Sequence, residues 1–157
     1  MAQASAILPT ILIVDDDSSV LSLLTQVMRR LAPGHEVIPT GDGEQALHLL
    51  TQRPICLLLT DYQLPGLNGL QLAAAAKQQL PSTCVVLMSG DVLTPAAQQE
   101  RAQQVDYYLH KPFPFQQLQA IVDSALTSPG RPAAQEQEVG AAGERRANDS
   151  SDFTARK

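Results

Sequence analysis

The stretch CLLLTD, residues 56–61, is a run of four apolar residues followed by a threonine and a carboxylate. A continuous apolar run, as opposed to an alternating one, is typical of a parallel strand that is covered on both faces. A carboxylate at the end of such a strand is unfavourable, because a buried and unpaired charge costs on the order of several kcal/mol or is driven to neutrality. Asp61 therefore needs a positive charge nearby.

Four other stretches are strand candidates, two of them equally apolar and two shorter or more polar: ILIV (11–14), VVLM (85–88), HEVIP (35–39) and YYL (107–109). Helical patterns alternate with these strands, and in the first of them apolar residues recur at helical spacing from Val20 to Leu31. The fourth helical pattern is polar on nearly every side and begins at Thr94-Pro95, which offers an N-cap and a first-turn proline. The alternation predicts an α/β fold with a doubly wound, five-stranded parallel sheet and helices on both faces.

The charge distribution divides the chain. Residues 1–130 carry 11 acidic and 6 basic side chains, whereas residues 131–157 carry five of each and almost no large apolar residues. A segment of the second kind buries too little surface to offset its ordering entropy. We expect an N-terminal extension over residues 1–9, one domain over residues 10–127, and a disordered tail or linker over residues 128–157.

The bulk composition excludes several classes of function. The net charge of −5 over 157 residues does not favour a nucleic acid as a direct partner. The chain begins without a basic region, and no apolar run approaches the roughly 18 residues of a membrane span, so we expect neither a secretory signal nor a membrane anchor. Cys56 and Cys84 lie in or beside apolar runs, which indicates buried, reduced thiols and a cytoplasmic protein.

Polar side chains follow the central strands, at one edge of the predicted sheet: Asp15-Asp16-Asp17, Thr60-Asp61, Ser89-Gly90 and His110-Lys111-Pro112. Carboxylates gathered at one edge repel one another, and aspartate oxygens are ligands that suit Mg²⁺. A magnesium ion beside the Lys111 ammonium would stabilise the negative charge on a phosphoryl group during its transfer. Asp61 would then be the nucleophile that forms an acyl phosphate.

At this point the sequence resembles a known family. The motifs ILIVDDD, LLLTDYQLPGLNGL, VVLMSGD and YYLHKPF occur in the order and spacing of the receiver domains of two-component response regulators. The likeness covers about residues 10–127 and is closest in kind to stand-alone, chemotaxis-regulator-like receivers. It implies the flavodoxin-like receiver fold, with strand order 2-1-3-4-5.

The resemblance also implies a phosphorylation site. Asp61 would accept a phosphoryl group from a sensor histidine kinase or a histidine phosphotransfer protein. Asp16 and Asp61 would bind Mg²⁺ directly, together with the backbone carbonyl of Gln63, and Asp15 would act mainly through a bound water.

The same resemblance implies a switch. Lys111 would pair with the carboxylate and then with the phosphoryl oxygens, and Lys111-Pro112 would be a cis peptide. Ser89 would follow the phosphoryl group, and Tyr108 would turn inward as the serine moves. One departure is Gly90, where the family more often has alanine.

The implied function is that of a phosphoprotein in phosphorelay signal transduction: an autocatalytic phosphoacceptor, not a turnover enzyme. Phosphorylation would change the surface made by the fourth helix, the fifth strand and the fifth helix, for docking of an unknown output partner, for phosphorelay, or for a homodimer. The chain would act alone or be the receiver portion of a longer protein.

Three alternatives stay open at this point. GDGEQA (41–46) matches a dinucleotide-binding glycine pattern, but an edge strand precedes it. IVDDDSSV (13–20) approaches the nucleophile motif of haloacid-dehalogenase-like phosphatases, which need a further acidic pair where this chain has only Asp123 before the tail. The third is a receiver fold that serves only as a binding module.

Overall fold

Five strands and five helices alternate along the computed structural model, which describes residues 8–127 and 137–138. The strands are β1 (Thr10–Val14), β2 (Glu36–Thr40), β3 (Ile55–Asp61), β4 (Cys84–Ser89) and β5 (Tyr107–His110). The helices are α1 (Ser18–Leu31), α2 (Gly43–Leu50), α3 (Gly69–Gln79), α4 (Pro95–Gln104) and α5 (Phe115–Thr127). Each predicted strand and helix is thus present, with strand ends that differ from the prediction by one or two residues.

The strands form one parallel sheet in the order β2-β1-β3-β4-β5, which confirms the predicted fold and strand order. A short sixth strand, β6 (Gln137–Glu138), pairs in parallel with β5 at the edge of the sheet. The sequence did not predict it, because it lies within residues 128–157, which we expected to be a tail. The rest of that tail and residues 1–7 of the predicted extension lie outside the described residues.

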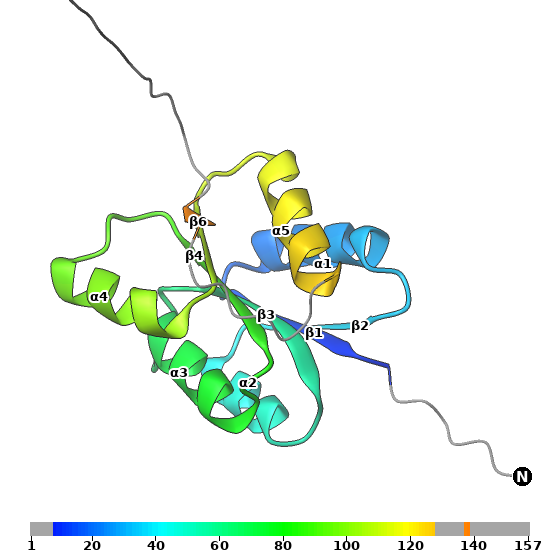
Figure 1. Cartoon of the computed structure of the whole chain (residues 1–157), viewed down its shortest axis with the longest axis horizontal. Helices are drawn as coiled ribbons and strands as arrows, with labels where there is room; N and C mark the ends of the chain where they lie inside the picture. The colour runs from blue at the N-terminus through cyan, green and yellow to red at the C-terminus, as the bar shows by residue number, and fades with distance from the viewer. Residues whose placement is uncertain (1–7, 128–136, 139–157) are drawn as a thin grey trace, which may run out of the picture.

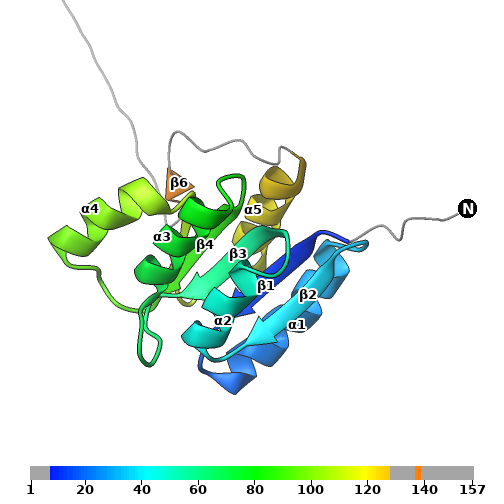
Figure 2. The ribbon, with the colours of Figure 1, turned by 90° about the horizontal axis from the view of Figure 1, so that it is seen from below.

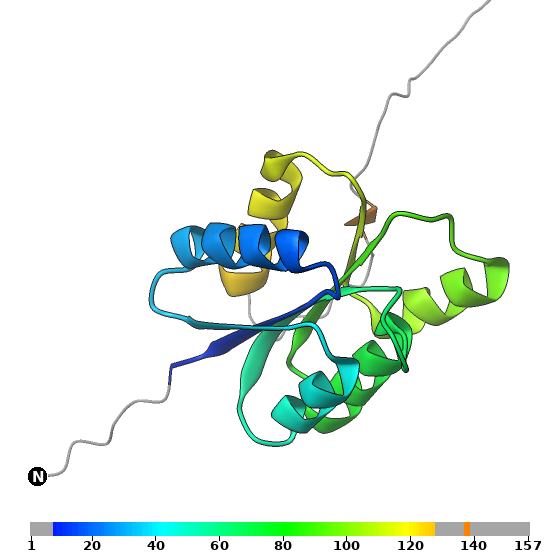
Figure 3. The same ribbon diagram turned by 180° about the vertical axis from the view of Figure 1, so that it is seen from behind.

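The helices cover both faces of the sheet. Helices α1 and α5 lie on one face, and α2 and α3 lie on the other, with α4 beside α3 (Figures 1 and 3). Two buried clusters fill the space between these layers, one beneath each set of helices. The central strands β1, β3 and β4 are buried almost throughout, as their continuous apolar runs predict.

Capping side chains begin the helices at the carboxyl edge of the sheet. Asp17 caps α1 by accepting hydrogen bonds from two backbone amides, and Asn68 forms a capping box with Gln71 at the start of α3. Thr94 caps α4 as predicted, and Pro95 follows in its first turn. Ala97 is the buried residue of α4, which explains why this helix carries no apolar stripe.

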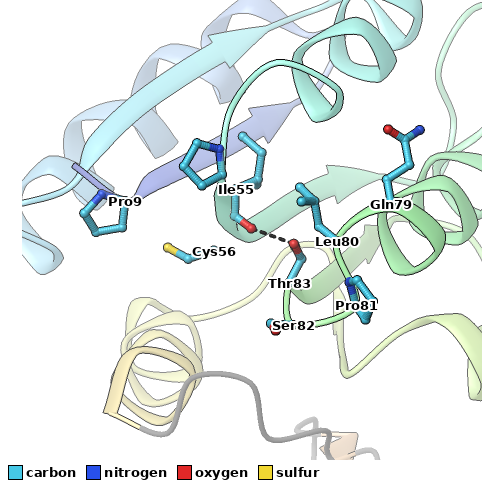
Figure 4. Close-up of a pocket in the computed structure, with 9 residues that line it drawn as sticks. Pro9, Ile55, Cys56, Gln79, Leu80, Pro81, Ser82 and Thr83 are labelled. Carbon is cyan, nitrogen blue, oxygen red and sulfur yellow. Dashed lines mark hydrogen bonds between the residues drawn. The ribbon is translucent and has the colours of Figure 1, made fainter. Parts of the chain in front are cut away.

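The opposite, amino edge of the sheet carries an apolar hollow of about 370 Å³. Figure 4 shows its lining, in which Pro9 and Ile55 face Leu80 and Pro81. Its buried polar group is satisfied, because the Thr83 hydroxyl donates a hydrogen bond to the Ile55 carbonyl oxygen. The hollow has no charged group in its lining and lies away from the predicted site.

Candidate functional site

The candidate site lies at the carboxyl edge of the sheet, where four neighbouring strands end. Asp15 follows β1, Asp61 ends β3, Ser89 ends β4 and Lys111 follows β5. These strands are adjacent and parallel, so their ends meet at one edge although residues 15 and 111 are far apart in the sequence. Figure 2 shows β1 and β3 running in the same direction, as their parallel pairing requires.

Three carboxylates gather at this edge. Asp15 is 1% exposed and Asp61 is 9% exposed, whereas Asp16 lies at the surface. One oxygen from each of the three lies within 4.8 Å of the others. One Asp15 oxygen also accepts a hydrogen bond of 2.9 Å from the Asp17 amide, which orients that carboxylate.

Lys111 brings one positive charge to the three carboxylates. Its Nζ donates a hydrogen bond of 2.8 Å to Asp15 Oδ2 and lies 3.3 Å from Asp61 Oδ1. The Lys111 amide donates to the Ser89 carbonyl oxygen at 2.8 Å, which ties the loop after β5 to the end of β4. The peptide bond between Lys111 and Pro112 is cis, as the resemblance implies.

Burial and charge oppose each other at Asp61. Burial has the largest effect and raises the pKa of Asp61 above its ordinary value. The Lys111 ammonium lowers this pKa, and the Asp15 carboxylate raises it. The net result is a raised pKa for Asp61. For Lys111, burial lowers the pKa, but the hydrogen bond and charge of Asp15 and the charge of Asp61 outweigh it, so this pKa is also raised. Lys111 therefore stays charged, while ionised Asp61 is not fully compensated.

The backbone around Asp61 is held by close packing. The Tyr62 amide donates to the Met88 carbonyl oxygen at 2.7 Å, and the Gly69 amide donates to the Tyr62 carbonyl oxygen at 2.8 Å. A Cβ atom at Gly69 would overlap the Asp61 carbonyl oxygen and would lie 2.9 Å from Leu87 Cδ1. The first residue of α3 is thus a glycine because the helix begins directly against the backbone of Asp61.

The two expected switch residues lie near the site but bond elsewhere. The buried Ser89 hydroxyl donates to the Asp91 carbonyl oxygen at 3.0 Å and accepts from the Asp91 amide at 3.1 Å. The half-buried Tyr108 ring lies under the Arg101 guanidinium, whose carbon is 4.7 Å from the ring centre. The structure therefore brings together Asp15, Asp16, Asp61 and Lys111, with Ser89 and Tyr108 beside them on β4 and β5.

The carboxylates fit a hard divalent cation. Their oxygens converge from two strand ends, and one ammonium faces three acidic groups, so a further positive charge would relieve the repulsion. Magnesium prefers such oxygen ligands and keeps several waters, for which the exposed side of Asp16 leaves access. Gln63 follows Asp61 by two residues in an exposed loop, and the use of its carbonyl oxygen stays a prediction.

The sequence interpretation missed Gly69, Asp91 and Arg101. The pair Asn68-Gly69, which precedes an apolar helical run, indicates a helix start but not its contact with Asp61. Asp91 holds Ser89 through its backbone, so its residue type carries no signal. Arg101 reaches Tyr108 from another element, which no local pattern reveals.

The structure also bears on two alternative motifs. In GDGEQA, Asp42 caps α2 and the preceding strand, β2, is the outermost strand, so this glycine pattern is a helix start. Asp123, the acidic residue after Lys111, is exposed on α5, away from the three carboxylates. Neither Asp42 nor Asp123 joins the cluster of Asp15, Asp16 and Asp61.

A doubly wound parallel sheet with three carboxylates and one ammonium at its carboxyl edge defines a flavodoxin-like domain with an acidic site suited to a cation. The chain belongs to the response regulator receiver domain family, which residues 11–123 match. None of the helices that the structure describes is long and apolar enough to cross a membrane.

Relatives of known function are regulators that contain this domain. The chain is 34% identical over 135 residues to the DNA-binding transcriptional regulator NtrC of Azospirillum brasilense, covering 86% of this chain and 28% of that protein. It is 33% identical over 115 residues to the NtrC of Klebsiella pneumoniae, covering 73% of this chain and 24% of that protein. The chain thus spans about a quarter of the length of these relatives.

Solved receiver domains share the fold. A CheY-like receiver domain protein from Methanospirillum hungatei JF-1 matches with a TM-score of 0.70 and 24% identity, over 77% of this chain and 95% of that chain. The signal receiver domain of an HD domain-containing protein from Pseudomonas fluorescens Pf-5 matches with a TM-score of 0.67 and 29% identity, over 80% of this chain and 92% of that chain.

Proposed function

We propose that this receiver domain accepts a phosphoryl group on Asp61. The observation that carries the proposal is the position of the Asp61 carboxylate, 3.3 Å from the Lys111 ammonium and within 4.8 Å of the Asp15 and Asp16 carboxylates. An Asp61 oxygen attacks the phosphorus of a phosphohistidine on a sensor kinase or phosphotransfer protein. The new bond joins oxygen to phosphorus, the bond between phosphorus and nitrogen breaks, and the imidazole leaves with that electron pair.

The neighbouring residues support this transfer in distinct ways. Asp16, Asp61 and the carbonyl oxygen of Gln63 would hold Mg²⁺ directly, and Asp15 would hold it mainly through a bound water. When bound, Mg²⁺ neutralises negative charge on the phosphoryl oxygens. The Lys111 ammonium is held by Asp15 at 2.8 Å, so it is already in place to donate to a phosphoryl oxygen. These residues account for transfer without a base, because the carboxylate is the nucleophile in its ionised form.

The proposed switch begins with an exchange of hydrogen bonds. A phosphoryl group brings a charge of about −1.5 to −2 and new acceptor oxygens to residue 61. The Ser89 hydroxyl would leave Asp91 for these oxygens, and Tyr108 would move into the vacated space. The surface of α4, β5 and α5 would change as a result, because a packed interior favours discrete arrangements over small continuous shifts.

The signal would be passed on through the changed surface of α4, β5 and α5, and the domain would not turn over a free substrate. The domain would act as a phosphoacceptor that docks a partner, relays the phosphoryl group or pairs with a second copy, in the cytoplasm, where thiols such as Cys56 and Cys84 stay reduced. DNA binding is in the names of the longer relatives. For this chain we propose a protein partner, because its net charge of −5 opposes contact with nucleic acid.

Intact-mass measurement after incubation with Mg²⁺ and a small acyl phosphate tests the proposal. The wild type should gain one phosphoryl group, and Asp61→Asn and a sample containing a chelator should gain none. Asp106→Asn, at the opposite edge of the sheet, is the matched control and should be phosphorylated like the wild type. Beryllofluoride, a stable mimic of the phosphoryl group, covers the case of rapid hydrolysis. A wild type that gains no mass and whose melting temperature does not rise with Mg²⁺ and beryllofluoride would favour the binding-only alternative.

A further inference from the structure

Strand β5 would be the last strand of a five-stranded receiver sheet, and such an edge presents unpaired backbone N–H and C=O groups. In this structure the edge is occupied: β6 runs parallel to β5, with Gln137 paired with Tyr107 and Glu138 paired with Tyr108. Figures 1 and 2 show β6 as a short orange arrow between α4 and α5. A segment beyond α5 therefore returns to the surface that we expect to change on phosphorylation.

The backbone of β5 shows which groups this strand uses. The Lys111 amide, directly after the strand, donates to the Ser89 carbonyl oxygen at 2.8 Å, toward β4. Successive backbone amides of a strand point to opposite sides within the sheet, so the Tyr107 amide also faces β4 and the Tyr108 amide faces the outer edge. Gln137, the register partner of Tyr107, lies at that outer edge.

The paired position is also the position of the expected switch residue. Tyr108 lies in register with Glu138 on one side and with Leu87 of β4 on the other. Its ring is covered by the Arg101 guanidinium of α4. The pairing involves two residues, and a net contribution of about 0.5–1.5 kcal/mol per hydrogen bond makes so short a strand displaceable.

We propose that the outer edge of β5 is a strand-addition site, which the chain's own segment at Gln137–Glu138 occupies in parallel orientation. The segment covers the edge beside Tyr108, and an extended segment of a partner protein would have to displace it to pair with the same backbone groups. The pairing itself does not depend on phosphorylation; only its relevance to signalling rests on the proposed function.

Amide hydrogen exchange of the full chain, resolved by residue and measured without Mg²⁺ or donor, tests this site. Gln137 is in register with Tyr107, which faces β4, so in a parallel pair the N–H and C=O of Gln137 face β5. Gln137→Pro removes this backbone donor from β6. We expect exchange of the Tyr108 amide to accelerate on the order of tenfold, the change that about 1.4 kcal/mol produces. The Tyr107 amide, which faces β4, and amides in the middle of α1 should keep their rates and so report an intact fold.

Ala147→Pro is the matched control, because it introduces the same residue ten positions further along the chain and should leave the Tyr108 amide unchanged. Equal Tyr108 exchange in the wild type and in Gln137→Pro would overturn the proposal. Acceleration of Tyr108 in both proline variants would overturn it as well, since the effect would not be specific to the paired position. Because no phosphoryl donor is present, failure of phosphorylation at Asp61 cannot produce either result.

Discussion

Two lysine–aspartate pairs lie at opposite edges of the same sheet, and they differ in how their charges are balanced. At the amino edge, Lys77 Nζ lies 2.6 Å from Asp106 Oδ2. At the carboxyl edge, Lys111 Nζ lies 2.8 Å from Asp15 Oδ2 and also faces Asp61. Both lysines are partly buried to a similar extent, with side chains 22% and 23% exposed, so burial does not separate the two pairs.

The surroundings do separate them. The Asp106 oxygen also accepts from the Val85 amide at 2.9 Å, and Lys77 also donates to the Thr83 carbonyl oxygen at 2.8 Å. One ammonium therefore meets one carboxylate, and further backbone partners satisfy both. At the carboxyl edge one ammonium meets three carboxylates, and burial and Asp15 hold the pKa of Asp61 above its ordinary value against the effect of Lys111. A balanced pair supports the fold, whereas an unbalanced cluster indicates a site that a cation completes.

The largest stability change should come from breaking the balanced pair. Asp106→Ala leaves Lys77 without its carboxylate and the Val85 amide without its acceptor. We expect a loss of about 3 kcal/mol in the free energy of unfolding, at the lower end for a buried pair because the lysine is partly exposed. Urea denaturation followed by circular dichroism measures it. A loss below about 0.5 kcal/mol would show that this pair behaves as a surface ion pair.

The second effect concerns the packing of α3 against Asp61. Gly69→Ala places a Cβ against the Asp61 carbonyl oxygen, so the strand end or the helix must shift. We expect a loss of about 2 kcal/mol in stability and slower phosphorylation. Gly90→Ala is the matched control at the same edge, because its nearest contact would be Lys111 Cβ at 4.0 Å. Equal stability of the two variants in the same denaturation experiment would contradict the role given to Gly69.

The third effect has the opposite sign. Burial and Asp15 raise the pKa of Asp61, so its ionised carboxylate destabilises the folded state. Asp61→Asn removes this charge. Without Mg²⁺ we expect the variant to be more stable than the wild type by about 1 kcal/mol, although it is not phosphorylated. Asp106→Asn should be less stable than the wild type and fully phosphorylated. Thermal unfolding of the two variants in the presence of a chelator compares them directly.

The smallest effect is a pH dependence at the balanced edge. Burial and then the charge of Asp106 raise the pKa of the Cys84 thiol to about 12. The unfolded chain loses this proton near pH 9, whereas the folded chain keeps it, so stability falls as the pH rises from about 9 toward 12. We expect the wild type to lose up to about 1 kcal/mol by pH 9.5 relative to Cys84→Ala. A difference in stability between the wild type and Cys84→Ala that stays constant across this pH range would contradict the raised pKa of Cys84.

The fold and most of the site were predictable because the sequence carries them locally. Continuous apolar runs mark the central strands, and polar residues follow where these strands end. Parallel order then brings Asp15, Asp61 and Lys111 together, whatever their distance along the chain. The position of Thr94 before Pro95 likewise predicted the start of α4.

The features that escaped prediction depend on contacts between distant elements. The pairing of Lys77 with Asp106 joins α3 to the start of β5, and nothing in either segment signals the other. The stacking of Arg101 on Tyr108 is of the same kind. Strand β6 consists of two polar residues in a polar segment. No apolar pattern in this segment predicts its pairing with β5.

Locating the phosphoryl group on the chain tests the central claim most directly. The protein is incubated with Mg²⁺ and a small acyl-phosphate donor. The aspartyl phosphate that forms on the protein is then reduced with borohydride, and the peptides are sequenced by mass spectrometry. Reduction converts a phosphorylated aspartate into homoserine and so marks the residue that carried the group. We predict homoserine at position 61, with Asp15, Asp16 and Asp106 unchanged. Homoserine at Asp15 or Asp16, with residue 61 still aspartate, would contradict the account.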